Sequence, residues 1–159
     1  MQFTAPWSDS LRLMTGAGSA IVVLAITIST LKRQPWLRIA AMCAVAGFLL
    51  VSWGFAPGGY TVDAARVTVL RPFGNVAVER ASVTAVRGFE DADSAGLMRT
   101  AGNGGLFGYY GWYKSDRLGS HKWYVTDRER MVLVETRDGA LVMSPGDPAR
   151  FIEAAKPSK

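Results

Sequence analysis

The sequence predicts a membrane-anchored α+β protein, in which a two-helix transmembrane hairpin precedes a small antiparallel β domain that ends in a helix. Three observations predict this fold. Two uncharged apolar stretches lie within the first 57 of the 159 residues. Short segments that alternate apolar and polar residues follow them, as in half-buried strands. A helix-capping sequence lies near the C-terminus.

The first apolar stretch extends from Leu13 to Leu31 without a charged residue. Its nineteen residues form a helix of roughly 28 Å at about 1.5 Å per residue, close to the hydrocarbon thickness of a bilayer. A cleaved signal peptide is the alternative. The basic residues, however, follow the stretch, and Ser29-Thr30-Leu31 is a poor cleavage site. We therefore expect an uncleaved span over 13–31.

The second stretch predicts a span over 39–56, which ends at the breaker cluster Pro57-Gly58-Gly59. Trp36 and Trp53 lie near its two ends, where interfacial indoles are favoured. Small residues recur at three- or four-residue spacing on the two helices. They permit close approach within the hairpin or equally mark a dimer face; they are Gly16, Ala20, Ala40, Ala44 and Gly47.

The connection 32–38 contains Lys32, Arg33 and Arg38. The positive-inside rule places this basic loop in the cytoplasm and both termini, with the C-terminal domain, outside it. The N-terminal part accounts for +3 of the net charge of +5, so residues 58–159 carry only +2. This balance does not indicate a nucleic-acid partner. The single cysteine, Cys43, excludes an intrachain disulfide and a cysteine-based metal site.

The domain is expected over 58–155. Arg66–Arg71 and Asn75–Glu79 predict a hairpin around Pro72-Phe-Gly-Asn75. Further strands are expected at 82–87, 122–126, 131–136 and 140–144, the last two joined by a turn at Asp138-Gly139. Asp147 is a natural N-cap for a final helix with Pro148 in its first turn, and 156–159 is a polar tail.

The stretch Arg99–Tyr113 contains five glycines and five aromatic residues. It lacks the third glycine of a dinucleotide fingerprint and the Gly-Lys-Ser/Thr of a P-loop. We expect a tightly wound loop that packs on its own domain. The alternative is a loop whose aromatic rings contact a partner or the headgroup region.

Other candidate chemistry is weak. His121 has no second metal ligand nearby and is expected at the surface or a strand edge. Ser144 lacks the frame of a nucleophile elbow. Glu90, Asp91 and Asp93 do not match a calcium loop, because position twelve is Gly102, and we expect a solvated acidic loop. We identify no catalytic, cofactor-binding or metal-binding residue and no small-molecule substrate, and we expect a non-enzymatic protein.

Two motifs resemble the bacterial pleckstrin-homology-like (bacterial PH) domain family. They are Arg99-Thr-x-Gly-x-Gly-Gly-x-Phe-Gly-Tyr-x-Gly and Ser144-Pro-x-Asp-Pro-x-x-Phe-Ile152, with Tyr124-Val-Thr126 between them. The resemblance implies a split barrel of two nearly orthogonal antiparallel sheets, capped by the C-terminal helix. It also implies a multi-pass protein of the bacterial cell (inner) membrane, since members often carry N-terminal membrane helices. It implies little about activity, because one fold hosts many functions.

Our first expectation is a module for protein interaction or self-assembly at the membrane surface, with the lipid bilayer and an unidentified protein as partners. The first alternative is a lipid-headgroup-binding module. The second is an accessory subunit of a membrane complex or an unrecognised enzyme. The candidate membrane or partner contacts are Leu106, Phe107, Tyr109, Tyr110, Trp112, Lys114, Arg117 and Lys122.

Overall fold

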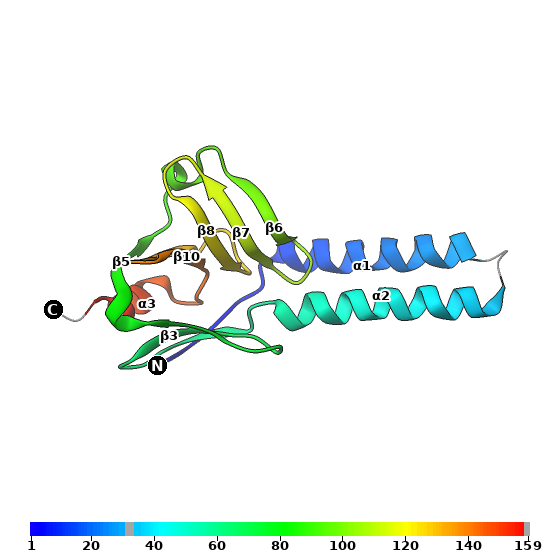
Figure 1. Ribbon diagram of the computed structural model, residues 1–159, viewed down its shortest axis with the longest axis horizontal. Coiled ribbons are helices and arrows are strands. Elements are labelled where there is room, and N and C mark those ends of the chain that lie inside the picture. Colours follow the sequence, from blue (N-terminus) through cyan, green and yellow to red (C-terminus); the bar gives the residue numbers. More distant parts are fainter. Residues whose placement is uncertain (31–33, 158–159) are drawn as a thin grey trace.

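The computed structural model describes residues 1–30 and 34–157. Helices α1 (Asp9–Thr30) and α2 (Pro35–Phe55) lie side by side and project from one end of a β-rich domain (Figure 1). Ser8 caps α1, because its Oγ accepts the N–H of Leu11 at 3.3 Å. The two predicted apolar helices are therefore present. Lys32 and Arg33 of the predicted basic loop, and residues 158 and 159 of the predicted tail, lie outside the described residues.

The strands form two sheets. A four-stranded sheet has the order β1-β2-β3-β4, with every pair antiparallel. Its strands are β1 (Gln2–Thr4), β2 (Gly59–Val62), β3 (Arg66–Leu70) and β4 (Val76–Glu79). The β3–β4 pairing confirms the predicted hairpin around Pro72–Asn75.

The six-stranded sheet has the order β5-β9-β10-β8-β7-β6. Its strands are β5 (Val83–Gly88), β6 (Met98–Gly104), β7 (Tyr109–Ser115), β8 (Gly119–Val125), β9 (Val132–Thr136) and β10 (Gly139–Met143). Two 3-10 turns lie between strands, η1 (Arg80–Ser82) and η2 (Asp91–Ser94). The β9–β10 hairpin forms at the predicted Asp138-Gly139.

The expectation of a purely antiparallel barrel is wrong in one pair. Strands β8 and β10 run parallel, with Val142 opposite Trp123. After β8 the chain leaves one place empty in the sheet and forms β9 beyond it. β10 then turns back from β9 into the empty place, antiparallel to β9 and parallel to β8. The two sheets share no ladder within the described residues, so the barrel is not closed.

The main core lies between the two sheets and beneath α3 (Pro148–Ala155), which contributes the buried Phe151 and Ala155. Asp147 caps α3 as predicted, since its side chain accepts the N–H of Arg150 at 3.0 Å. A second apolar cluster around Trp123 and Leu133 includes alternate residues of β8 and β9. Because the side chains of a strand point to alternate faces, this cluster lies on the outer face of the six-stranded sheet.

Residues near the N-terminus are part of the β domain, which the sequence reasoning did not anticipate. β1 pairs with β2, and Phe3 is buried in the main core, edge-on to the ring of Phe151 at 5.2 Å. The glycines of the helices do not have the first of their two expected roles, close approach within the hairpin. A Cβ at Gly16 or Gly47 would meet open space, so these glycines do not mediate close packing of α1 on α2.

Buried hydroxyl groups connect the two sheets. Tyr60 of β2 donates its phenolic O–H to the carbonyl of Tyr124 in β8 at 2.6 Å. Ser144 Oγ accepts the N–H groups of Thr126 and Asp127 at 2.8 and 3.2 Å. Burial raises the pKa of Tyr60 to about 12. Ser144 therefore has a structural role at the ends of β8 and β10, because its hydroxyl accepts hydrogen bonds that the ending strands no longer form.

Candidate functional site

Most of the glycine-aromatic stretch forms strands, so the expectation of a loop is wrong except at its tip. β6 and β7 form an antiparallel hairpin around residues 105–108. Gly102 and Gly111 lie opposite each other with φ of 112° and 123°, a region open almost only to glycine. A Cβ on either would overlap the backbone of the other strand. The glycines therefore let two backbones approach closely.

The tip of this hairpin is bound to α1. Thr15 donates its hydroxyl to Gly105 O at 3.3 Å, and the N–H of Phe107 donates to Thr15 Oγ1 at 3.0 Å. The ring of Phe107 lies edge-on to Trp7 at 6.1 Å. Phe107 has a φ of 63°, alone among the described non-glycine residues in having a positive value. Such a conformation costs of order 1–3 kcal/mol, which these contacts offset.

The β6–β7 hairpin and the β3–β4 hairpin both contact α2. Tyr110 donates its phenolic O–H to the carbonyl of Ser52 at 2.6 Å. At the β3–β4 tip, the N–H of Phe73 donates to Gly54 O at 2.8 Å, and the Phe73 ring occupies the space where a Gly54 side chain would lie. The domain is thus attached to the helix ends through two hairpin tips (Figure 1).

The structure separates the predicted contact residues into three groups. Leu106, Phe107, Tyr109 and Tyr110 lie at or beside the tip near the helices. Trp112 and Lys122 are cross-strand partners, with the Lys122 ammonium 4.6 Å from the indole centroid. Lys114 and Arg117 lie towards the other end of β7, so they do not join the tip.

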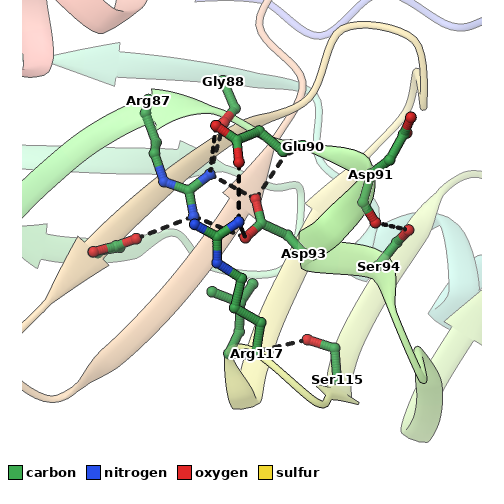
Figure 2. Close-up of polar contacts among 10 residues, drawn as sticks. Arg87, Gly88, Glu90, Asp91, Asp93, Ser94, Ser115 and Arg117 are labelled. Carbon is green, nitrogen blue, oxygen red and sulfur yellow. Dashed lines mark hydrogen bonds and ion pairs between the residues drawn. The ribbon is translucent and has the colours of Figure 1, made fainter.

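Arg117 belongs to an ionic cluster around Asp93 (Figure 2). The buried carboxylate of Asp93 accepts two bonds from the Arg87 guanidinium, at 2.6 and 2.8 Å. It also accepts the N–H of Glu90 at 2.9 Å. The hydrogen bond from Arg87, opposed by burial, lowers the pKa of Asp93 to about 2. The expectation of a solvated acidic loop is therefore wrong for Asp93, although Asp91 is exposed.

The expectation for His121 is also wrong. The side chain is 1% exposed, and its Nδ1 lies 2.9 Å from Gly119 O. It lies beside Trp123 on the same face of the six-stranded sheet, because residues two apart in a strand share a face. Across residues 1–30 and 34–157, no group of three His, Cys, Asp or Glu side chains is placed to hold a metal ion.

A cavity of about 350 Å³ follows the free edge of β4. Val76 and Val78 line one side, and Trp112, Lys122 and Leu141 of the six-stranded sheet line the other. Trp112 is 46% exposed. The Arg80 N–H donates to Ala65 O at 2.8 Å, so the alternation of an antiparallel ladder directs the N–H and C=O of Ala77 away from β3. This edge is open to a further strand.

In a comparison with protein families, residues 58–158 match the bacterial PH domain. The chain belongs to the bacterial PH domain family. No curated protein and no solved structure matches it. The matched range contains every strand from β2 onward and α3, so the resemblance of the two motifs is confirmed. β1 and the helix pair precede the bacterial PH domain, and β1 adds a strand to its sheet.

Proposed function

We propose that the chain is an integral membrane protein whose bacterial PH domain is a non-enzymatic module for protein interaction or assembly at the membrane surface. The observation that carries this proposal is the apolar surface of the helix pair. Both helices are long and apolar enough to cross a bilayer. Large apolar side chains are exposed along them; they include Leu13, Ile21, Leu24, Ile28, Ile39, Met42, Phe48 and Leu50. An apolar surface of this extent favours lipid or a protein partner over water.

The attachment of the domain supports a position at the bilayer surface. Only Ala56, Pro57 and Gly58 separate α2 from β2, and hydrogen bonds fix both hairpin tips to the helices. The domain therefore has little freedom to move away from the helix ends. Its interaction surface would be the open edge of β4 with the adjoining cavity, because an unpaired edge accepts an added strand. An accessory subunit of a membrane complex would use the same edge.

A photo-crosslinking amino acid in place of Ala77 tests this surface in the full-length protein in its native membrane. We expect a light-dependent product at about twice the monomer mass for self-assembly, or at another defined mass for a different protein. The same amino acid in place of Arg150, which is exposed on α3, serves as the control and should give no product. Equal yields at both positions, or no product from position 77, would contradict the proposal.

We further propose a multi-pass arrangement in the bacterial inner membrane, with the basic loop 32–38 in the cytoplasm and the domain outside it. The N-terminus and α3 lie on the domain side of the helix pair, which is compatible with two crossings (Figure 1). In a Cys43→Ala background, Ser158→Cys should react with an impermeant thiol reagent in intact cells. Labelling only after lysis would reverse the orientation.

A second candidate function is lipid-headgroup binding, which the aromatic character of both hairpin tips favours. Phe107 and Phe73 lie at the two tips, beside the ends of α1 and α2. Arg71 places its guanidinium 5.4 Å from the ring centroid of the exposed Phe55. Aromatic rings and arginine side chains are both favoured at the membrane interface.

A further inference from the structure

A second cavity lies on the outer face of the six-stranded sheet, away from the free edge of β4. Its volume is about 320 Å³, and its lining includes Arg99, Tyr109, Tyr113, Trp123 and Arg128. No acidic residue lines it. Two arginines, two phenols and an indole therefore face a common space without a carboxylate among them.

Arg99 and Arg128 have no acidic partner among the described residues, unlike three other arginines of the domain. Arg87, Arg117 and Arg130 each lie within 4 Å of a carboxylate. No such ion pair is found for Arg99 or Arg128 among the described residues. Burial raises the pKa of Tyr113, and the charges of Arg99 and Arg128 oppose that rise, so both act on the same phenol.

The position of each guanidinium follows from its neighbours. A Cβ on Gly104 would overlap the Arg99 guanidinium, so the glycine provides the space in which this side chain lies against β6. The Arg128 guanidinium lies 5.5 Å from the ring centroid of Tyr109 and 6.0 Å from that of Trp123. Stacking on aromatic faces holds a guanidinium while its N–H groups remain available in the plane of the guanidinium.

The indole of Trp123, which lines this cavity, carries a buried N–H group. The residue is 1% exposed, and its Nε1 has no hydrogen-bond partner in the described part of the chain. A buried donor without an acceptor is unfavourable. Tyr113 stacks on the indole at 4.5 Å and Phe89 lies edge-on at 5.7 Å, so the ring is held in place.

We propose that this cavity binds a phosphate group, with the guanidinium groups of Arg99 and Arg128 and the indole N–H of Trp123 as donors. Phosphate oxygens accept several charge-assisted bonds and match the planar fork of arginine. Asp91 and Glu129 line a neighbouring cavity that shares Trp123 and Arg128, so the anion is directed to the acid-free side. The phosphate belongs either to a soluble molecule or to an anionic lipid. Only the lipid source rests on the membrane anchoring proposed above.

The test follows the indole N–H resonance of Trp123 in the full-length protein, assigned with a Trp123→Phe variant. The first arm adds inorganic phosphate to protein in an uncharged detergent. The second compares lipid nanodiscs that contain phosphatidylglycerol with nanodiscs of phosphatidylcholine alone. We expect a saturable shift of this resonance in at least one arm. Saturation by inorganic phosphate identifies a soluble source, and a shift only with phosphatidylglycerol identifies a headgroup.

The variant Arg99→Gln/Arg128→Gln should weaken the binding at least tenfold. The control Arg137→Gln/Arg150→Gln removes the same charge from two exposed arginines outside the cavity and should change it less than twofold. An unmoved Trp123 resonance in both arms overturns the proposal. Equal weakening by the two double variants also overturns it, because binding would then follow net charge alone. Failure of the phosphatidylglycerol arm together with a positive phosphate arm leaves the site intact and counts against the headgroup function only.

Discussion

Replacement of Gly111 by alanine is expected to destabilise the bacterial PH domain by about 3 kcal/mol or more. The added Cβ would overlap the carbonyl of Ala101 on the partner strand, and the φ of 123° is itself unfavourable for alanine. The backbone cannot move away without separating β6 from β7, which would also release the tip from Thr15. Urea denaturation of the full-length protein in detergent, followed by tryptophan fluorescence, measures the change.

Gly88→Ala is the matched control for this prediction. It adds the same methyl group to the same sheet, but the Cβ would meet open space and the φ is not positive. We expect a change within about 0.5 kcal/mol. Similar midpoints for the two variants would show that the close approach of β6 and β7 does not constrain the fold.

Asp93→Asn is expected to cost about 2–3 kcal/mol, because it removes the buried charge that accepts two bonds from Arg87, while Arg87 keeps Glu135 at 3.4 Å. Asparagine retains the size of the side chain but removes the charge. Asp91→Asn changes an exposed carboxylate in the same 3-10 turn and should have little effect. The free energies of unfolding of the two variants at pH 7 give the comparison. An Asp93→Asn protein as stable as the Asp91→Asn protein would contradict the importance of the cluster.

The same carboxylate predicts a pH dependence. The pKa of Asp93 is lower in the folded chain, at about 2, than its ordinary value of 3.8. The folded state therefore binds this proton less readily than the unfolded chain does. The stabilisation, about 2–3 kcal/mol, is fully present above about pH 5. It declines as the pH falls below 3.8 and is lost as the pH falls through the folded pKa of about 2. In the Asp93→Asn variant this part of the acid sensitivity should disappear.

The features that the sequence predicted well depend on neighbouring residues. The hairpin at Pro72–Asn75, the turn at Asp138-Gly139 and the Asp147 cap each follow from a short local motif, and the structure contains them. The two apolar helices follow from length and the absence of charge. The family resemblance followed from glycine positions that the structure explains by close backbone contact at Gly102 and Gly111.

The features that were missed depend on residues far apart in the chain. β1 is three residues long, and only its pairing with β2 makes it a strand. The pairing of β8 with β10 and the burial of His121 depend on the order of strands, which no local pattern contains. Lys114 and Arg117 are near Phe107 in sequence, but the extended strand β7 places both of them far from Phe107.

The pairing of β1 with β2 gives the chain an unusual order of assembly. Residues 5–58, with both helices, are an insertion between two adjacent strands of one sheet. During synthesis β1 leaves the ribosome first, and its partner follows only after the whole helix pair has been made. The sheet can therefore be completed only when the ends of the two helices have returned to the same place. Both helices are therefore connected covalently to this sheet, α1 through β1 and α2 through β2.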